Sequence, residues 1–450
     1  MKKIVMYSSN SKRRSKGSNC VVFPKWSRLW NDLADAHSDV EIYLVVQLNG
    51  RYFLDLFNGE LCSVPEKIHL VQMDMEDKLD EFVEKITELK PDVAIAMPGP
   101  VSGIDWNGLR DAAIAEELEQ KGIHTICYPL RTAEICFDKW LTHCFLEENG
   151  FNVAKAVYCH HELFTAGKND TQSTGNVYQE MVLHKVKKLP FPVIIKGTTG
   201  SASTGVYVAK DFEDARTYLL SDKNCEDLII EEMLKGQLCG TEIHGVKGNY
   251  NVLPPFMIFT TDNAAVTDPL GLTTLKFGPM RSDKFYAKEL VEELTRLAEL
   301  MELNGNNNLD LMLCGDKWYI IEINARWSGL TTLTSCSEGR RPYEIYLQEY
   351  TGPDKDYSDF DKLKIACSFK MSDITGDELE KVAGEEYVNS LIQYEVIRPD
   401  MTRFNFTDVI IGGFENYEDM AECLKTLQGK YPGAIAAEIV DAIYKKLPEL

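Results

Sequence analysis

The strongest chemical signal in the sequence comes from Asp310, Glu322 and Asn324, within the segment NNNLDLMLCGDKWYIIEINARWSG. Two apolar runs, Leu309–Leu313 and Trp318–Ile323, predict two strands joined by a glycine-containing turn. Side chains on a strand alternate between its faces, so Glu322 and Asn324 are expected to point the same way. If the two strands pair as a hairpin, Asp310 joins them on that face.

Two carboxylates and an amide oxygen on one face form a hard donor set made only of oxygen. Mg²⁺ prefers such donors and usually keeps room for the phosphates of a substrate. Arg326 follows on the same side and would add a positive charge beside those phosphates. The segment therefore predicts a metal and phosphate site, against the simpler alternative of solvated acidic residues near a turn.

A loop rich in glycine and hydroxyl side chains, residues 197–205, lies between two short β-rich runs. Glycine lets backbone N–H groups approach a polyphosphate closely, and serine and threonine add small donors. The loop is neither a Walker loop nor a dinucleotide fingerprint, because Gly-Lys-Ser/Thr is missing and a strand follows it. The alternative is an ordinary flexible hairpin. Lys196 directly precedes the loop, and Lys139 is a second candidate cation.

The first part of the chain predicts an open α/β sheet. Substrates of such sheets often bind at the carboxyl ends of the strands, so Ser8–Asn10 and Pro98–Gly103 are candidate loops. Asn49-Gly50 is a strong turn signal and predicts a hairpin inserted in this sheet. The expected strands are Lys3–Tyr7, Val40–Leu48, Tyr52–Phe57, Val93–Met97 and Thr125–Tyr128, and the expected helices are Leu79–Leu89 and Leu109–Gln120.

Later segments alternate between strands and helices and predict three further units. One long helix is expected over Thr132–Asn149 and another over Ala287–Leu303. A break at Thr351-Gly352-Pro353 predicts a boundary before a small C-terminal α+β unit. The expected architecture is α/β and α+β multidomain, divided at residues 1–130, 131–235, 236–352 and 353–450.

Composition limits the classes of partner. The chain has 450 residues, enough for two or three cores, and a formal net charge of −22 that argues against nucleic acid as a partner. Its 12 cysteines include no Cys-x-x-Cys pair and predict reduced thiols, as in a cytoplasmic protein. No apolar run is long enough for a signal peptide or a membrane span, so no membrane partner is expected.

The order of these motifs resembles the ATP-grasp superfamily over roughly residues 132–352. Each motif is weak alone, but five in this order are specific. The matching motifs are F-D-K at Phe137–Lys139, P-V-I-I-K with its glycine loop at Pro192–Gly205, I-I-E-E-M-L at Ile229–Leu234, D-L-M at Asp310–Met312 and E-I-N-A-R at Glu322–Arg326.

The resemblance implies that ATP lies between two α+β subdomains. Lys139 and Lys196 would contact its α- and β-phosphates, and the loop would close over the β- and γ-phosphates. Asp310, Glu322 and Asn324 would hold two Mg²⁺ ions, with Mn²⁺ as an alternative. The loop residues expected to contact the phosphates are Gly200, Ser201, Ser203 and Gly205.

The resemblance also implies contacts to the nucleoside. Glu231 would accept from the adenine amino group, and the backbone at Glu232 and Leu234 would hold the ring edge. The carboxylate that binds the ribose is expected soon after this hinge, and Glu242 is the candidate because Leu238 stands where the family often has glutamate.

The implied reaction joins a carboxylic acid to an amine. Transfer of the γ-phosphoryl group makes an acyl phosphate, which the amine then attacks with loss of phosphate. Arg326 would steady the phosphate or the oxyanion, and Arg281 is a second candidate cation. The expected partners are small-molecule acid and amine substrates, and a homodimer is possible because dimers are common in the superfamily.

Within the superfamily, the chain looks like the carboxylate–amine ligases. D-alanine–D-alanine ligases carry an arginine two residues before the first metal carboxylate, where this chain has Asn308. The E-I-N-A-R form and the extra C-terminal unit are more similar to amino-acid (dipeptide) ligases and to biotin-carboxylase-like members. Alternatives from other classes are a non-catalytic, regulatory nucleotide-binding protein and a small-molecule kinase on the same fold.

Overall fold

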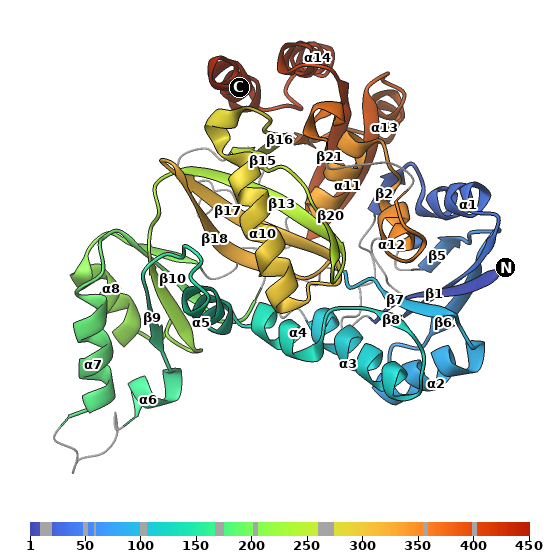
Figure 1. Cartoon of the computed structure of the whole chain (residues 1–450). Helices are drawn as coiled ribbons and strands as arrows, with labels where there is room; N and C mark the ends of the chain where they lie inside the picture. Colours follow the sequence, from blue (N-terminus) through green and yellow to red (C-terminus); the bar gives the residue numbers. More distant parts are fainter. Residues whose placement is uncertain are drawn as a thin grey trace.

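The computed structural model describes residues 1–9, 20–47, 53–57, 60–99, 106–166, 175–200, 206–259, 274–353, 359–397 and 403–450. Their strands form sheets of five, four, ten and two strands. Figure 1 shows the N-terminal sheet at one end, the four-stranded sheet at the other and the ten-stranded sheet between them. Within the described residues, no helix is long and apolar enough to cross a membrane.

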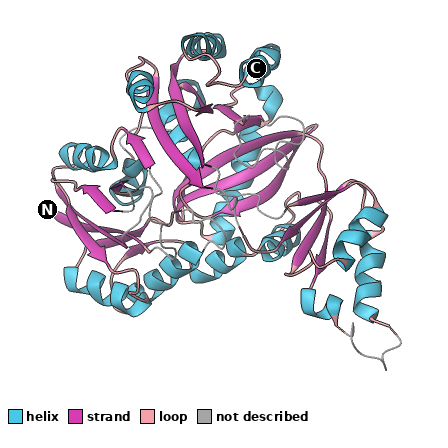
Figure 2. Ribbon diagram, turned by 180° about the vertical axis from the view of Figure 1, so that it is seen from behind, coloured by secondary structure: helices cyan, strands magenta, loops and turns pink. Residues whose placement is uncertain are grey.

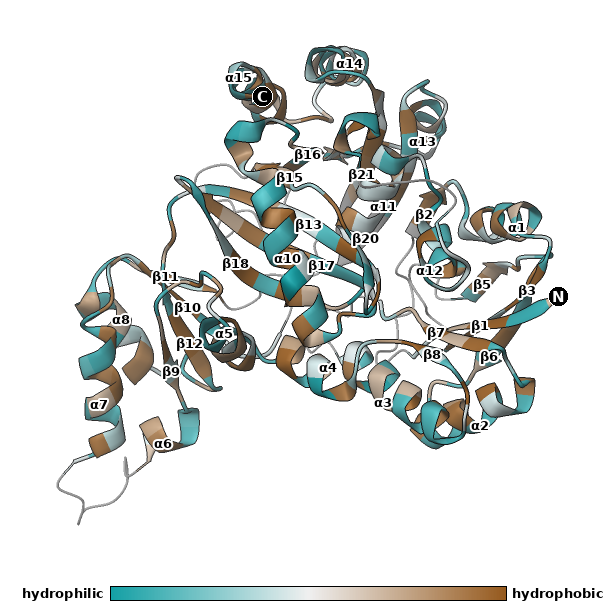
Figure 3. Ribbon diagram, in the orientation of Figure 1, coloured by the Kyte–Doolittle hydropathy of each residue, from teal (hydrophilic) through white to brown (hydrophobic). Residues whose placement is uncertain are grey.

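The N-terminal sheet is parallel, in the order β6-β3-β1-β7-β8. Its central strands are buried on both faces, which is why their sequences are almost continuously apolar. α2 and α3 cover one face, and α1 and α12 cover the other. Figure 3 shows α2 with both polar and apolar residues along its length, as expected for a helix with one face on a sheet. The bounds are β1 Lys2–Ser8, β3 Val40–Gln47, β6 His69–Met73, β7 Val93–Ala96, β8 Thr125–Ile126, α1 Trp26–Ala36, α2 Leu79–Leu89, α3 Trp106–Gln120 and α12 Pro342–Thr351.

The predicted hairpin around Asn49-Gly50 is wrong. β3 pairs in parallel with β1 and β6, and β4 (Asp55–Phe57) pairs with β5 (Glu60–Ser63) in a separate two-stranded sheet. The turn signal is local, whereas the pairing of β3 follows from burial of most of its side chains within the sheet.

The four-stranded sheet is antiparallel, in the order β11-β10-β12-β9. α6, α7 and α8 pack on one face through an apolar cluster, and the opposite face carries Lys196 and Glu231. Figure 2 shows this unit as a lobe beside the rest of the molecule. The bounds are β9 Ala156–Cys159, β10 Val193–Gly197, β11 Tyr207–Ala209, β12 Leu228–Glu232, α6 His161–Thr165, α7 Val177–Val186 and α8 Phe212–Leu220.

The helix predicted over Thr132–Asn149 is two helices, α4 (Leu130–Phe137) and α5 (Lys139–Glu148). The break occurs at Asp138, whose carboxylate accepts hydrogen bonds from the backbone N–H groups of Trp140 (2.8 Å) and Leu141 (2.9 Å). This is an N-cap, and it places Lys139 on the first turn of α5.

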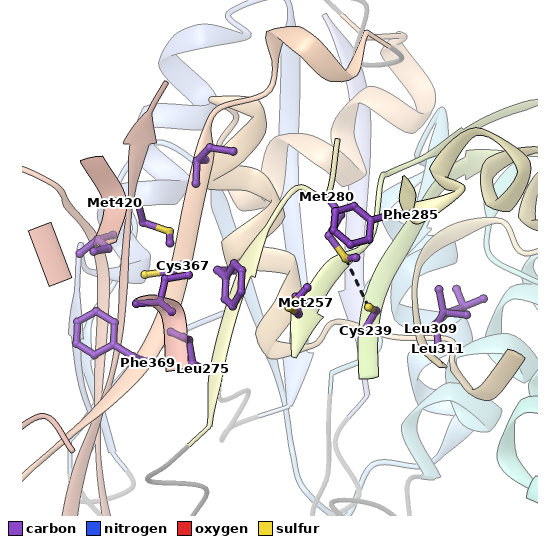
Figure 4. Close-up of a cluster of buried hydrophobic side chains, with 14 of the residues drawn as sticks. Cys239, Met257, Leu275, Met280, Phe285, Leu309, Leu311, Cys367, Phe369 and Met420 are labelled. Atoms are coloured by element: carbon purple, nitrogen blue, oxygen red, sulfur yellow. Dashed lines mark hydrogen bonds between the residues drawn. The ribbon is translucent and has the colours of Figure 1, made fainter. Parts of the chain in front are cut away.

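The ten-stranded sheet follows the order β18-β17-β13-β15-β16-β19-β21-β20-β2, with β14 beside β13. α10, α14 and α15 cover one face, whose buried cluster is shown in Figure 4 with the Cys239 and Met280 sulfur atoms 3.5 Å apart. α11 covers part of the other face. The bounds are β2 Cys20–Phe23, β13 Gln237–Val246, β14 Asn249–Val252, β15 Phe256–Phe259, β16 Leu275–Gly278, β17 Gly305–Cys314, β18 Lys317–Asn324, β19 Ile365–Ser372, β20 Val388–Ile397, β21 Arg403–Phe414, α10 Ala287–Met301, α11 Gly329–Glu338, α13 Gly376–Ala383, α14 Tyr417–Lys430 and α15 Ala437–Lys446.

The expected division after residue 352 does not coincide with a break in this sheet. β16 pairs with β19, so the C-terminal strands continue the sheet that carries the acidic hairpin. Helix α12 does end at Thr351, next to the predicted boundary. The end of a helix does not determine how the following strands pair. The C-terminal strands therefore extend the face on which the candidate site lies.

Candidate active site

The two predicted strands form the expected antiparallel hairpin, β17 and β18. Asp310 lies directly opposite Glu322, and Asn308 lies opposite Asn324. The register shifts after Asp310, as at a β-bulge, next to the paired carboxylates. Asp310, Glu322 and Asn324 all line one cavity of about 190 Å³. The structure thus brings the three predicted metal ligands together.

The electrostatics of this hairpin suit a bound cation. The pKa of Asp310 is raised to about 6, mainly by burial and then by the charge of Glu322, against the lowering effects of Lys276, Arg326 and Lys196. Two carboxylates held side by side repel each other, and a cation between them would relieve that repulsion.

The donor set fits magnesium in chemical type. It consists of oxygen atoms only, from two carboxylates and one amide. Within the described residues, no group of three or more His, Cys, Asp and Glu side chains is placed to hold a metal. The predicted set therefore reaches three protein donors only through the Asn324 amide, and substrate phosphates would have to supply further oxygens.

Lys139 contacts both the hairpin of β17 and β18 and the glycine loop. Its ammonium nitrogen lies 3.3 Å from Oε1 of Glu322 and donates to the carbonyl oxygen of Gly200 at 2.8 Å. The backbone N–H of Lys139 donates to the carbonyl of Thr198 at 2.7 Å. These contacts bring Lys139 and Gly200 to the carboxylates, whereas the other predicted loop contacts, Ser201, Ser203 and Gly205, lie outside the described residues.

Lys196 and Glu231 form a second charged pair on the same side of the four-stranded sheet. Their Nζ and Oε2 atoms are 2.6 Å apart, and the side chains are 11% and 14% exposed. His143 lies close by on α5: burial lowers its pKa, and the charges of Glu231 and Lys196 act on it in opposite directions. His143 was not predicted, because a single histidine inside a helix carries no sequence signal.

Arg326 lies beside the hairpin of β17 and β18. Its Nη2 donates to Oδ1 of Asn324 at 3.0 Å, and it lines the same cavity. The next residue, Trp327, donates its backbone N–H to the carbonyl of Pro98 at 2.9 Å. The described start of the predicted substrate loop Pro98–Gly103 is thus close to the site. In the other candidate loop, the N–H of Ser9 donates to Asp111 at 2.9 Å.

The structure contradicts the ribose assignment of Glu242. This side chain is 0% exposed, and its carboxylate accepts hydrogen bonds from Thr331 (2.6 Å) and Thr334 (2.8 Å) and contacts His244 (3.0 Å). A carboxylate enclosed beneath α11 cannot reach a ribose. The Gly-x-Glu pattern, Gly240 to Glu242, lies further along β13 than the hinge position expected for a ribose ligand. At this point of the strand the glutamate is in the core and not at the hinge.

The structure also places Arg281 away from the carboxylates. Its charge acts on Glu415 and Tyr417, where β21 leads into α14, and it does not line the cavity of Asp310. Arg281 lies beyond the end of β16, while Lys276, nearer the start of that strand, faces the site. Of the two cations of this segment, Lys276 lines the cavity and Arg281 does not.

The predicted contact between the backbone of Glu232 and the adenine ring cannot use the backbone N–H. The N–H of Glu232 donates to the carbonyl of Lys155 at 2.9 Å, and its carboxylate accepts from the N–H of Lys155 at 2.9 Å. That N–H is part of the sheet and is excluded as a donor to an adenine ring. Leu234 lies two residues after the end of β12 and stays the predicted hinge contact.

Several residues of the cavity were not predicted. Lys276 and Ile258 come from β16 and β15, and Ser328 and Leu330 from the start of α11. Burial lowers the pKa of Lys276, partly offset by the charge of Asp310. Pairing across four strands brings these residues together, and no local spacing encodes that pairing.

Comparison with known proteins agrees with this geometry. The family model of the ATP-grasp domain matches residues 136–330. Those residues are an ATP-grasp domain. A D-alanine–D-alanine ligase of Clostridium botulinum is 25% identical over 261 residues, which cover 54% of this chain and 76% of that protein.

Two solved structures share the fold across nearly the whole chain. An L-amino acid ligase from Bacillus licheniformis superposes with a TM-score of 0.62 at 17% identity, covering 95% of this chain and 97% of that one. N5-carboxyaminoimidazole ribonucleotide synthetase from Thermotoga maritima has a TM-score of 0.57 at 16% identity, covering 96% and 98%. The predicted ATP-grasp resemblance is confirmed over residues 136–330, and the expected fold, with α/β and α+β parts, is confirmed across the chain.

Proposed function

We propose that the protein is an ATP-dependent, ADP-forming ligase that joins a carboxylic acid to an amine, with amino-acid-like substrates. The observation that carries this proposal is the meeting of Lys139, on α5, with Glu322 and Asp310, on the hairpin of β17 and β18. Cations on one side and oxygen ligands on the other are what phosphoryl transfer needs.

The lysines and Arg326 provide the protein's share of charge neutralisation. A free carboxylate is a poor acyl donor because its oxygen is a poor leaving group. Attack of the acid carboxylate on the γ-phosphorus of ATP breaks the bond to the β-phosphate oxygen and gives an acyl phosphate and ADP. Lys139 and Lys196 would hold the phosphates, and Arg326 would stabilise the charge on the transferred group.

The second step is attack by the amine. Its nitrogen bonds to the acyl carbon, phosphate leaves, and the nitrogen gives up a proton. Arg326, fixed by its hydrogen bond to Asn324, would stabilise the oxyanion of the tetrahedral species. When bound by Asp310, Glu322 and Asn324, Mg²⁺ (or Mn²⁺) would supply Lewis-acid neutralisation of the phosphate oxygens.

The site supports an amino-acid-like substrate better than a larger one. The cavity beside the carboxylates holds about 190 Å³ and is lined by the apolar side chains of Ile258 and Leu330 together with charged groups. Relatives of this chain include D-alanine–D-alanine ligases, and a structural neighbour is an L-amino acid ligase. Both act on small zwitterions, and this supports the choice.

The test is a screen of amino acids in pairs for ATP-dependent release of phosphate, with the mass of the product measured. The proposal expects phosphate and ADP only when both an acid and an amine are present, and a product formed with loss of water. Transfer of phosphate to one substrate alone would identify a kinase. Nucleotide binding with no turnover across the panel would identify a regulatory binder. Either outcome rejects the ligase.

A further inference from the structure

The cavity beside the metal hairpin has two chemically different ends. Asp310 and Glu322 lie at one end, on β17 and β18, and Lys276 lies at the other, on β16. β13 and β15 lie between β17 and β16 in the sheet. Three spacings of about 4.8 Å separate the backbones of β17 and β16, so a small molecule has room between the two ends.

Between the two ends, the wall of the cavity formed by the sheet includes Gly240, which has no side chain to fill the space. This residue lies opposite Asp310 in the sheet. A Cβ atom there would come within 3.2 Å of Leu330 Cδ2 and 3.4 Å of Ile258 Cδ1. The middle of the cavity is therefore apolar and narrow, whereas its two ends are charged.

Lys276 is held at its end by the surrounding elements. Its strand lies between β15 and β19, with Ile258 on one side and Ser368 on the other. Its ammonium nitrogen comes within 4.0 Å of a Cβ built on Gly329, the first residue of α11. The positive end of that helix and the charge of Lys370 make the surroundings of Lys276 more positive, whereas the carboxylates of Asp310, Asp408 and Glu242 act in the opposite direction.

A buried ammonium group is stabilised by a nearby anion, and the acidic groups around Lys276 already have other partners. Asp408 is already paired with Lys370, at 2.6 Å. Asp310 and Glu322 are the proposed ligands of a divalent cation, and that cation would repel Lys276. An anionic group between the two ends would satisfy both sides. A ligase for amino acids has one substrate with such a group, the amine, whose carboxylate takes no part in the reaction.

We infer that Lys276 binds the unreacted carboxylate of the amine substrate, which is therefore an amino acid and not a simple amine. The inference rests on the proposed function and adds which residue selects the second substrate. The amino group would face the acyl phosphate at the metal end, and the carboxylate would face Lys276. Ile258, Leu330 and the cavity wall at Gly240 would border the side chain.

The experiment compares an amino acid with its neutral carboxamide as the amine substrate. The best acid from the pairwise screen is held fixed, and kcat/KM is measured for both amines with the full-length protein. The unmodified protein is expected to prefer the amino acid. Lys276→Met keeps the aliphatic stem and should lower kcat/KM for the amino acid about tenfold or more, the usual effect of losing a charge-assisted hydrogen bond. The value for the carboxamide should stay within about twofold.

Two further variants sharpen the result. Lys276→Arg keeps the charge and should retain a preference for the amino acid. Lys364→Ala removes an exposed lysine just before β19 that pairs with Glu415, and it should change neither value. Thermal unfolding of each variant checks that the fold is kept.

Three outcomes overturn the inference while leaving the ligase intact. They are an equal loss for both amines in Lys276→Met, an unchanged preference in that variant, and a change confined to the KM of the acid. Failure to release phosphate with any acid–amine pair would reject the proposed function itself, and the inference with it.

Discussion

Lys139 Nζ lies 3.3 Å from Glu322 Oε1, although α5 and β18 are far apart in sequence. Lys139 starts a helix that is anchored to the glycine loop through the carbonyls of Thr198 and Gly200. Glu322 belongs to the hairpin that carries the proposed metal ligands. A polyphosphate bound to a metal on Glu322 would therefore also lie within reach of the lysine.

Replacement of Glu322 tests the metal assignment. Glu322→Ala removes one of two carboxylates, and we expect ATP-dependent phosphate release to fall by about a hundred- to a thousandfold, as when one main electrostatic contact to the reacting group is lost. Asp316→Ala is the matched control, because Asp316 is an exposed acid in the turn of the same hairpin. Phosphate release and far-ultraviolet circular dichroism are the measurements. Near-normal turnover in Glu322→Ala would refute the assignment.

Replacement of Lys196 tests the nucleotide side. Lys196→Met removes a buried ammonium that pairs with Glu231 at 2.6 Å. Loss of a charged contact to phosphate should weaken ATP binding roughly 10- to 100-fold, because such contacts contribute about 1.5–3 kcal/mol. Isothermal titration with a non-hydrolysable ATP analogue measures it, and Lys210→Ala, an exposed lysine after β11, is the control. Equal affinity in Lys196→Met and the unmodified protein would place the phosphates elsewhere.

The raised pKa of Asp310 predicts how stability depends on pH. Its folded-state pKa of about 6 lies above the ordinary value of 3.8, so ionisation of Asp310 disfavours folding. That cost is absent below about pH 4 and is complete above about pH 6. A shift of about two units corresponds to at most about 3 kcal/mol.

Asp310→Asn should therefore unfold at a higher temperature than the unmodified protein at pH 8, in a chelator that removes divalent cations. The difference should shrink towards pH 4, where Asp310 is protonated in both the folded and the unfolded state. Thermal unfolding between pH 4 and pH 8 measures it. A variant that is less stable than the unmodified protein at pH 8 would contradict the assigned cause.

Local features of the fold were predictable where the signal lay within one segment. The hairpin of β17 and β18 follows from apolar runs around a Gly-Asp turn, and it fixes Glu322 and Asn324 on one face. Helix α2 agrees in both bounds, Leu79–Leu89, because its apolar spacing is regular. Most strand positions follow for the same reason.

Features set by pairing between distant segments were not predictable. The continuation of the ten-stranded sheet into β19 depends on contacts between residues far apart in sequence, which periodicity does not encode. Lys276 joins the cavity through that sheet, and a lysine in a short strand looks like a surface residue. The assignment of Glu242 failed because a short motif can occur a few residues further along a strand. The residue types are then the same, but the side chain lies in different surroundings.

The corrected position of Glu242 leads to a prediction that separates structure from nucleotide binding. Glu242→Ala would leave the hydroxyl group of Thr331 without its buried acceptor and would remove one of the two acceptors of the Thr334 hydroxyl. We expect a loss of stability of at least about 2 kcal/mol, because each unsatisfied buried polar group costs about 1–3 kcal/mol.

A ribose ligand would instead change the preference for ATP over 2′-deoxy-ATP. Urea unfolding measures the first effect, and the ratio of kcat/KM for the two nucleotides measures the second. Because Glu242 is fully buried beneath α11, the ratio should stay within about twofold of that of the unmodified protein, well below the roughly tenfold change expected from losing a charged hydrogen bond. A stable variant with an altered nucleotide ratio would restore the ribose assignment.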